Sequence, residues 1–584
     1  MKILNNMSEN LKILGINYGG HDTSACIMIG GKFLAVCEEE RYIGKKHTRN
    51  FPENAISDCL KKASISINQI HEIALSYNPE MLKIDNFDQI ISPKRKNLKK
   101  DDLKKLVEMR TQSFEFENFI RQKLNFKGKI TPHLHHLCHL ASCYFPSGFD
   151  DALVVSHDGI GEIDCSLMAT ASNGQISIFH HGNQWPNSLG LLYAAVTHYL
   201  GWKYNSDEGI VMGLAPYGDD TELIPGGKKT FREVFREIIY SVDDFDYEID
   251  RSWIAFHDVR DKWVSEKFVR TFGPKRSPEG QIDEHHKHVA CALQNRLEEI
   301  IIEQLKKCKE KFGLKKLCFS GGVALNCSLN GKIVENKIFD EIFVQPASGD
   351  NGTAIGACYL SAINFNRNMK PIKWDNYYLG SSFTNDEIEQ QLKNLKIKYT
   401  KDEDLAKNVA KKLASQKIIG WFQDGAEFGP RALGNRSILT APFPKEMKDI
   451  LNSKVKFRES FRPFAPAILS EFANSYFEIE QETPHMLIAA KVRSDKISEI
   501  PAVVHVDETA RLQTVSSSDN PIFRKLIECF HKETDCPVLL NTSFNVKGQP
   551  IVNSPVDAIK CFLSTEIDVL AIGDFIADKH DQSF

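Results

Sequence analysis

The sequence predicts an α/β protein with more than one domain, and three observations support that class. Short apolar strands alternate with helix-like patterns, and three of the strands end at glycines. The chain has 584 residues, whereas single hydrophobic cores stop growing beyond about 250–300 residues. Hydrophobic residues make up 42% and charged residues 26% of the chain, which is an ordinary balance for a globular protein.

The N-terminal region begins with three predicted strands. "KILGIN" (12–17) is followed by "DTSACIMIG" (22–30) and "KFLAVCEEE" (32–40), and a pair of glycines makes the turn between the last two. This order of elements places His21 and Asp22 in the first tight loop.

The pattern of a strand that ends at glycines recurs twice further along. "ALVVSHDGIGE" (152–162) is a buried strand that ends at Asp158, and "KLCFSGGVALNCSL" (316–329) ends at Gly321 and Gly322 before a helix. Such a junction leaves backbone N–H groups that can face a phosphate or ribose. One loop is weak evidence, because tight turns need glycine anyway. Three in this order indicate an actin-like ATPase fold of the ribonuclease-H type (ASKHA), with paired sheets that close on a nucleotide.

Four histidines occur within the stretch "HLHHLCHLASC" (133–143). If the stretch is helical, His135 and His139 lie one turn apart on the same face. That spacing allows one helix to offer two imidazoles to a single metal ion. The alternative is a helix end with ordinary polar histidines. The choice depends on where the carboxylates lie.

The composition changes after about residue 365, and we expect two domains, 1–370 and 380–584. The second concentrates cations, glycines and aromatic residues in a few motifs. Guanidinium and ammonium groups in such motifs suit a site for phosphates and a planar base. The alternative is a set of salt bridges that pin loops. The motifs are "EFGPRALGNRSIL" (427–439), "KVKFRESFRPFAP" (454–466), "HVDETARLQTV" (505–515) and "LLNTSFNVKGQPIV" (539–552).

Several function classes are disfavoured. The net charge of −4 gives no general case for binding nucleic acid or an anionic membrane. The charge-dense segment 92–110 is predicted to be a solvated surface helix. No apolar run approaches the roughly 18–20 residues of a membrane span, and the N-terminal segment does not read as a signal peptide. The 14 scattered cysteines predict reduced thiols in a cytoplasmic protein.

Motifs along nearly the whole chain resemble those of the O-carbamoyltransferase family, which includes the nodulation-factor, cephalosporin and tobramycin carbamoyltransferases. The resemblance implies a first domain similar to tRNA threonylcarbamoyl-transferring proteins and a second similar to the enzymes that make threonylcarbamoyl-adenylate. The motifs, in family order, are "GGHDTSA", "EEERY…KKH", "HHLCHLAS", "HDGIGE", "MGLAPYG", "SGGVALN", "GDNGTAIGA", "EFGPRALGNRS", "FRESFRPFAP", "HVDETARLQTV" and "LLNTSFNVKGQPI".

The resemblance also implies a set of roles in the first domain. A divalent metal, expected to be iron, is held by His135, His139, Asp158 and Asp350. The metal would polarise the carbamoyl carbonyl as a Lewis acid. His21 is expected to be the general base on the acceptor hydroxyl, since a neutral imidazole suits that task, and Lys46 to stabilise the leaving AMP. The nucleotide is expected to contact Gly321, Gly322 and Asn326.

In the second domain, the resemblance implies formation of carbamoyl-adenylate from carbamoyl phosphate and ATP with Mg²⁺, with release of pyrophosphate. Fixed cations would stabilise the developing negative charge. The first domain would then transfer the carbamoyl group to a hydroxyl of a small molecule or sugar. The residues expected to bind ATP and carbamoyl phosphate are Arg431, Arg436, Lys456, Arg462, Arg511, Asn541 and Ser543.

Two departures from the family pattern leave alternatives open. Asp424 and Gly425 stand where an Arg is usual, and Ile210 stands where a Lys is common. The alternatives are a catalytically altered nucleotide-binding member and a tRNA threonylcarbamoyl-modifying protein; a sugar kinase would leave the second domain unexplained. A closed homodimer is the default expectation. The acceptor is not fixed, since its pocket walls are expected in the segments 80–130 and 219–290.

Overall fold

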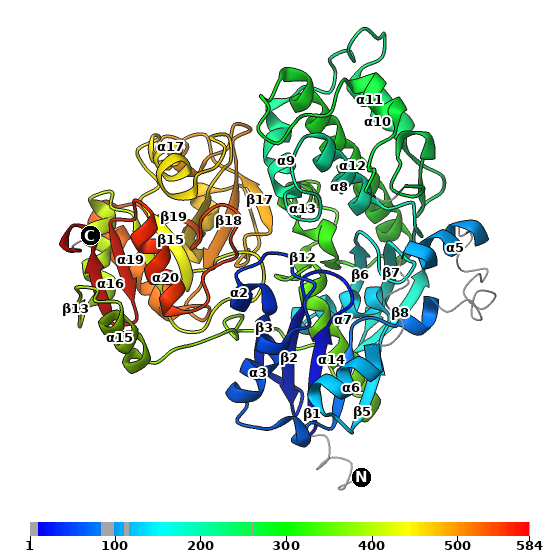
Figure 1. Ribbon diagram of the computed structural model, residues 1–584. Coiled ribbons are helices and arrows are strands. Elements are labelled where there is room, and N and C mark those ends of the chain that lie inside the picture. The colour runs from blue at the N-terminus through cyan, green and yellow to red at the C-terminus, as the bar shows by residue number, and fades with distance from the viewer. Residues whose placement is uncertain (1–9, 83–98, 110–115, 260, 583–584) are drawn as a thin grey trace. The chain divides into compact units, whose positions relative to one another are not determined.

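The structure is a computed structural model that describes residues 10–82, 99–109, 116–259 and 261–582. The chain forms two compact units (Figure 1). The first comprises Met1–Val36 and His47–Trp374, and the second comprises Cys37–Lys46 and Asp375–Phe584. A short segment from the N-terminal part of the chain therefore belongs to the second unit.

The first sheet of the first unit has the order β3-β2-β1-β4-β5. β1 pairs antiparallel with β2 and parallel with β4, and β4 pairs parallel with β5. β1 is the central strand, and its residues Ile13, Leu14 and Ile16 are fully buried. The strands are β1 (Lys12–Asn17), β2 (Ser24–Ile29), β3 (Lys32–Glu38), β4 (Glu72–Leu75) and β5 (Lys129–Pro132).

The second sheet repeats this plan, with the order β12-β11-β6-β7-β8. β6, β7 and β8 form an antiparallel meander, and β6 pairs parallel with β11, which pairs parallel with β12. Two sheets that share one strand order confirm the predicted α/β class with ribonuclease-H-type sheets in pairs. The strands are β6 (Asp151–His157), β7 (Ser166–Ser172), β8 (Gln175–His180), β11 (Lys316–Ser320) and β12 (Glu341–Val344).

Two helices pack against each other and against these sheets: α7 (His135–Ser147) and α14 (Thr353–Phe365). Their close approach depends on glycine. A Cβ at Gly356 would lie 1.8 Å from the carbonyl oxygen of Cys138, and one at Gly15 of β1 would lie 2.4 Å from that of Ala354. The backbones therefore come too close for any side chain at these positions, and α7 is held in a fixed place.

The insertion after β8 is largely helical. Its aromatic core includes Phe231, Phe235, Phe268 and Phe272, whose rings contact one another. β9 (Ile239–Ser241) and β10 (Tyr247–Ile249) form a small hairpin beside it. The helices of the first unit between β8 and α14 include α8 (Leu189–Tyr199), α9 (Glu208–Leu214), α10 (Phe231–Ile238), α11 (Glu266–Phe272), α12 (Glu284–Phe312) and α13 (Cys327–Glu335).

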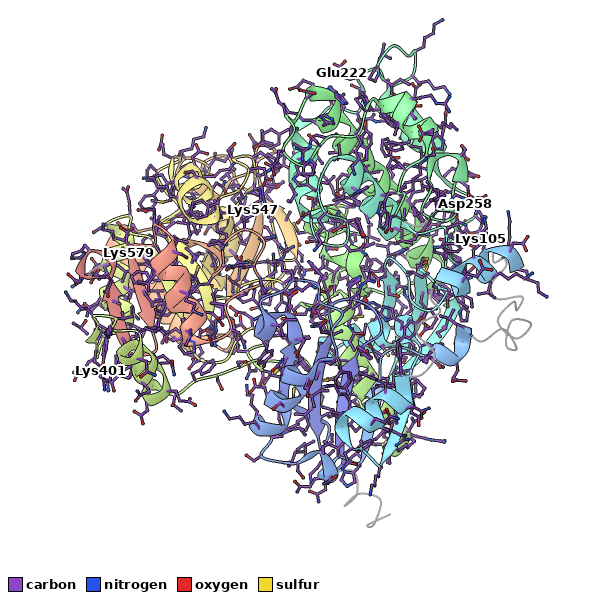
Figure 2. All side chains as sticks on the ribbon, viewed as in Figure 1. Lys105, Glu222, Asp258, Lys401, Lys547 and Lys579 are labelled. Carbon is purple, nitrogen blue, oxygen red and sulfur yellow. The ribbon has the colours of Figure 1, made fainter. Side chains whose placement is uncertain are left out.

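The charge-dense segment 92–110 lies partly outside the described residues, but 100–109 form α5 (Lys100–Met109). Leu103 and Leu106 of α5 are buried, and its Lys105 pairs with Asp258 of the insertion (Figure 2). This helix is therefore packed on one face. α3 (Glu53–Lys62) and α6 (Phe116–Leu124) complete the helices described in the first half of this unit.

The second unit is built on one sheet with the order β13-β21-β20-β14-β15-β19-β16-β18-β17. The strands are β13 (Thr400–Lys401), β14 (Ile419–Phe422), β15 (Arg436–Thr440), β16 (Ala465–Leu469), β17 (Ile488–Lys491), β18 (Thr509–Val515), β19 (Val538–Ser543), β20 (Val569–Ile572) and β21 (Phe575–Asp578). Its helices include α15 (Asn385–Asn394), α16 (Leu405–Ala414), α17 (Met447–Leu451), α18 (Ala473–Tyr476), α19 (Pro521–Thr534) and α20 (Pro555–Ser564).

The segment from the N-terminal part of the chain contributes α2 (Glu39–Ile43) to this second unit. Arg41 is buried and donates to the carbonyl oxygen of Gly429 at 2.6 Å. The hydroxyl of Tyr42 lies 2.9 Å from that of Ser381. The contact of Arg41 ties α2 to the loop that begins the "EFGPRALGNRS" motif.

Candidate metal and nucleotide sites

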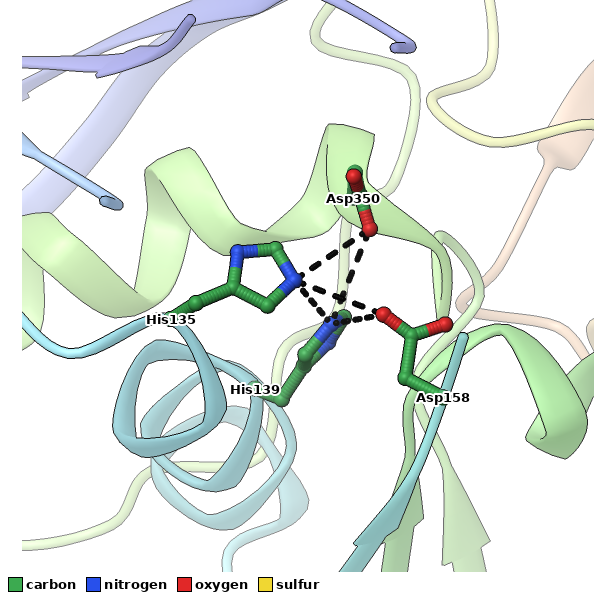
Figure 3. A group of neighbouring side chains, drawn as sticks. All are labelled: His135, His139, Asp158 and Asp350. Atoms are coloured by element: carbon green, nitrogen blue, oxygen red, sulfur yellow. Dashed lines mark hydrogen bonds and ion pairs between the residues drawn. The ribbon is translucent and has the colours of Figure 1, made fainter. Parts of the chain in front are cut away.

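Two histidines and two aspartates converge at one buried point of the first unit (Figure 3). His135 and His139 lie one turn apart on α7, and their Nε2 atoms are 3.1 Å apart. Asp158 follows β6, and its Oδ2 lies 3.4 Å from His135 Nε2 and 3.2 Å from His139 Nε2. Asp350 precedes α14, and its Oδ1 lies 3.3 Å and 3.9 Å from the same two nitrogens.

Other polar groups hold His135 and Asp158 in place. His135 Nδ1 lies 3.2 Å from the carbonyl oxygen of Ser76, so with Nδ1 as the donor its Nε2 keeps a lone pair toward the cluster. The N–H of Gly322 donates to Asp158 Oδ1 at 2.9 Å, which leaves Oδ2 facing the histidines. The buried Glu162 accepts the backbone N–H of His135 at 3.1 Å. The inner atoms of His135 and Asp158 are therefore oriented before any ion arrives.

The electrostatics of this cluster favour positive charge. Burial opposes a charged ring at His135, yet Asp350 and Asp158 raise its pKa well above the usual value. Two imidazole nitrogens and two carboxylate oxygens form a donor set that suits a borderline or hard divalent ion. All four ligand atoms lie within 4.8 Å of one another. These residues fit a divalent metal, with each imidazole and carboxylate directing one atom inward.

The other two histidines of the stretch 133–139 are placed differently. His136 is buried, its Nδ1 lies 2.8 Å from the hydroxyl of Ser156, and burial lowers its pKa to about 3. His133 Nε2 lies 2.8 Å from the hydroxyl of Ser361, and burial lowers its pKa to about 4. Both rings are therefore neutral near pH 7 and serve the packing of α7.

His21 lies beside the metal cluster and belongs to a second group of polar side chains. Its Nε2 is 3.9 Å from Asp350 Oδ2, and its Nδ1 is 2.8 Å from Asp22 Oδ2. The other oxygen of Asp22 lies 2.8 Å from His47 Nδ1. Asp22 thus bridges two imidazoles. Burial opposes a charged ring at His21, but Asp350 and Asp22 raise its pKa to about 10.

The backbone of this loop is held by Asn17, whose side-chain amide donates to the carbonyl oxygens of His21 and Asp22 at 3.2 Å and 2.9 Å. The hydroxyl of Ser76 in turn donates to Asn17 Oδ1 at 2.9 Å. Ser76 therefore contacts both Asn17, which holds the His21 loop, and, through its carbonyl, His135. Sequence reasoning missed Asn17, Ser76 and His47, although His47 ends the motif "EEERY…KKH".

The predicted nucleotide-binding residues of the first unit follow β11. Gly321 has φ +86°, and a Cβ there would lie 2.1 Å from the carbonyl oxygen of His157. The N–H of Gly322 donates to Asp158 Oδ1. Asn326 caps α13, and its amide forms reciprocal hydrogen bonds with that of Gln294. These contacts occupy the Asn326 side chain. Lys46, expected to stabilise the leaving AMP, is the last residue of the segment that groups with the second unit.

The second unit contains a cluster of cations that repel one another. Lys456 is buried, and burial together with Arg458, Lys46 and Arg462 lowers its pKa well below the usual value. Burial, Arg462 and Arg511 likewise lower the pKa of Arg458. Lys456 donates to the carbonyl oxygens of Ser543 and Asn545, which are neutral acceptors. Such a cluster is suited to an anion with several negative charges.

The remaining predicted residues of this unit divide into two kinds. Asn541 is buried and donates to Gln513 Oε1 at 2.9 Å. Arg436 is fully buried and donates to the carbonyl oxygens of Gln423, Ser381 and Asp424, over the ring of Phe422. Arg436 therefore serves the fold. Those at least partly exposed are Arg431, Arg462, Arg511 and Ser543.

Sequence comparison identifies the family. Residues 12–359 match the model of the carbamoyltransferase N-terminus, and residues 410–579 match that of the carbamoyltransferase C-terminus.

The chain belongs to the carbamoyltransferase family.

Particular relatives agree with this assignment. The nodulation protein NolNO of Sinorhizobium fredii (strain NBRC 101917 / NGR234) is 35% identical, over 96% of this chain and 80% of that one. The 3'-hydroxymethylcephem-O-carbamoyltransferase of Streptomyces clavuligerus is 31% identical, over 63% of this chain and 64% of that one. Among solved structures, HypF of T. kodakarensis has a TM-score of 0.31 and 13% identity, covering 62% of this chain and 48% of that one. The two family models and the curated relatives show that the protein is an enzyme of the carbamoyltransferase class.

Both departures from the pattern expected for this family have a local structural reason. A Cβ at Gly425 would lie 2.2 Å from the carbonyl oxygen of Tyr378, so no larger residue fits there. Asp424 is exposed with φ +37°, and its carbonyl oxygen accepts from Arg436. Ile210 is buried in α9.

In the described ranges, no helix of this family member has the length and apolar character needed to cross a membrane.

Proposed function

We propose that the enzyme is an ATP-dependent O-carbamoyltransferase that works in two steps, one in each unit. The observation that carries the proposal is the convergence of His135, His139, Asp158 and Asp350 at one buried point. The cation cluster of the second unit supports the other half of the proposal. O-Carbamoyl transfer is also the activity named for the cephem enzyme to which the chain is similar.

In the first step, carbamoyl phosphate and water give carbamate and inorganic phosphate. A carbamate oxygen then attacks the α-phosphorus of Mg²⁺-ATP, and pyrophosphate leaves to give carbamoyl-adenylate. The charge on the leaving pyrophosphate and on the α-phosphoryl oxygens needs fixed cations. Lys456, Arg462 and Arg511 supply them in the second unit, and Arg431 and Ser543 are proposed to complete the site. Asn541 lies near the end of β19, two residues before Ser543, and its hydrogen bond to Gln513 positions that end of the strand.

In the second step, the acceptor hydroxyl attacks the carbamoyl carbon, the bond to AMP breaks, and the hydroxyl proton moves to His21. A divalent metal, proposed to be Fe²⁺, would polarise the carbamoyl carbonyl as a Lewis acid when bound. Asp22 and Asn17 orient His21 so that its Nε2 faces the cluster. Asp350 raises the pKa of His21, so the ring already carries a proton near neutral pH. The negative charge of Asp350 must therefore be compensated before His21 can act as a base.

The acceptor is proposed to be a hydroxyl of a small molecule or sugar, as the names of the similar cephem and nodulation proteins suggest. Lys46 is proposed to stabilise the leaving AMP, and within the second unit its charge also helps to lower the pKa of Lys456. A cytoplasmic location and a homodimer stay predictions.

The experiment that tests this proposal needs no knowledge of the acceptor. Purified protein is mixed with ATP, Mg²⁺ and carbamoyl phosphate, with and without Fe²⁺, and pyrophosphate and carbamoyl-adenylate are followed. Pyrophosphate release that requires carbamoyl phosphate and is lost in Arg511→Ala supports the first step. ATP binding without pyrophosphate release under any metal would contradict it and favour a catalytically altered nucleotide-binding protein.

A further inference from the structure

The loop that carries the cation cluster of the second unit also presents an exposed aromatic ring. Phe457 is 52% exposed, more than any other Phe, Tyr or Trp residue among those that the structure describes. Its neighbours in the chain are the buried Lys456 and the partly buried Arg458, and the pKa of each is lowered. A solvated ring therefore lies between two groups that belong to an anion-binding cluster.

The backbone at Phe457 is strained. Its φ and ψ are +49° and +51°, in the left-handed region, where a bulky residue is a genuine outlier. It follows directly after the π-helical turn Asn452–Lys456, and such turns are frequent at functional sites. An ordinary loop sequence would place glycine or asparagine here, so the ring is present despite a conformational cost.

The strain persists because one buried residue determines the path of the loop. The carbonyl oxygen of Asn452 accepts the N–H groups of Phe457 and Arg458. Its side chain accepts from Arg458 Nε at 2.7 Å and donates to the carbonyl oxygens of Ser460 and Arg462. These contacts fix the backbone on both sides of Phe457, and its ring is directed to solvent.

We propose that Phe457 is the platform on which the planar base of ATP stacks in the second unit. The inference rests on the proposed binding of ATP there and extends it to the residue that recognises the base. The neighbouring cations hold the phosphates, and the ring holds the base. Stacking of a base on an aromatic ring tolerates different bases and contributes enough that removing the ring weakens binding between about 5-fold and about 150-fold.

The test measures, with the full-length protein, the binding of the non-hydrolysable analogue AMPCPP and of tripolyphosphate, which lacks a base, by calorimetry. Phe457→Leu keeps an apolar side chain but removes the ring, and Phe457→Tyr keeps the ring. We expect Phe457→Leu to weaken AMPCPP at least about 5-fold, to leave tripolyphosphate within about 2-fold, and Phe457→Tyr to bind both like the unchanged protein.

Phe457→Gly separates binding from stability. Glycine adopts a φ of +49° without steric cost, so this variant should melt no lower than the unchanged protein and yet lose AMPCPP affinity. Leu395→Ala, at another exposed apolar residue of the same unit (39% exposed), is the control and should change neither affinity.

Two outcomes would overturn the proposal: AMPCPP affinity that is unchanged in Phe457→Leu, or equal losses for AMPCPP and tripolyphosphate, which would assign Phe457 to the shape of the cation loop. The proposed function fails differently. In that case the unchanged protein binds AMPCPP but releases no pyrophosphate from ATP and carbamoyl phosphate, while the base-dependent difference is still measured. If the unchanged protein binds neither probe, both proposals are wrong.

Discussion

At the scale of single residues, the four inward-facing side chains of the first unit make the sharpest prediction. His139→Asn removes one of two imidazoles whose Nε2 atoms are 3.1 Å apart. Loss of a ligand weakens metal binding, so we expect the amount of bound divalent metal to fall by at least about 10-fold. The measurement is mass spectrometry of the dialysed protein. His133→Asn, whose ring contacts Ser361 instead, is the control. Equal metal content in His139→Asn would contradict the site.

Asp22 is the second residue with a testable role, because each of its oxygens faces one imidazole at 2.8 Å. Asp22→Asn replaces one acceptor by a donor and releases either His21 or His47. We expect carbamoyl transfer to slow by at least about 100-fold, because a positioned acid–base group contributes about 100- to 10,000-fold, whereas pyrophosphate release is unchanged. The measurement compares both half-reactions with an acceptor that the unchanged enzyme carbamoylates. Equal slowing of both would indicate a general folding defect.

The protonation of Lys456 should make polyphosphate binding depend on pH. Burial and Arg458 hold its pKa well below the usual value, and a bound polyphosphate would raise it again. Binding therefore takes up a proton at pH values between the lowered pKa of the free protein and the raised pKa of the complex, so affinity should fall as the pH rises through that range. Calorimetry with tripolyphosphate in buffers of different ionisation enthalpy should show this proton uptake. The uptake should disappear in Lys456→Met, and its persistence there would contradict the assignment.

At the scale of elements, the contact between α7 and α14 determines where the metal ligands lie. Gly356→Ala would place a methyl group 1.8 Å from the carbonyl oxygen of Cys138, so the helices must separate. We expect a loss of stability of about 1–3 kcal/mol or more together with weaker metal binding, measured by thermal unfolding and metal analysis. Gly209→Ala in α9 is a matched control with open space, and should stabilise by about 0.5–1 kcal/mol.

Elements also show how far the sequence alone could be read. The i, i+4 spacing of His135 and His139 predicted a shared helix face, and the glycines after β6 and β11 predicted the repeated sheet plan. Asp22 and His47 meet although 25 residues separate them, so no local pattern could pair them. Arg436 and Arg511 look alike in sequence, but only burial reveals that Arg436 donates to backbone carbonyls of the fold.

At the scale of the whole molecule, buried neutral histidines predict sensitivity to acid. Burial lowers the pKa of His136 to about 3 and that of His157 to about 4. In the unfolded chain these rings titrate near pH 6.5. Below that pH the unfolded chain binds protons that the folded chain does not, so the free energy of unfolding falls as the pH falls toward about 4.

We therefore expect the melting temperature to decrease below about pH 6.5, measured by circular dichroism. His157→Leu removes one such group. Its unfolding free energy should fall less steeply with decreasing pH, by up to about 1.4 kcal/mol per pH unit for one proton. A pH dependence identical to that of the unchanged protein would contradict the lowered pKa of His157.

The small segment Cys37–Lys46 has a consequence for how this gene can be divided. It is encoded among the strands of the first unit, yet it folds with residues encoded more than 300 codons later. A fragment that starts at Asp375 would lack the buried Arg41 and its bond to Gly429. No single cut in the reading frame therefore yields two complete halves, and recombination that exchanges the C-terminal half between relatives must find a compatible α2 in the recipient.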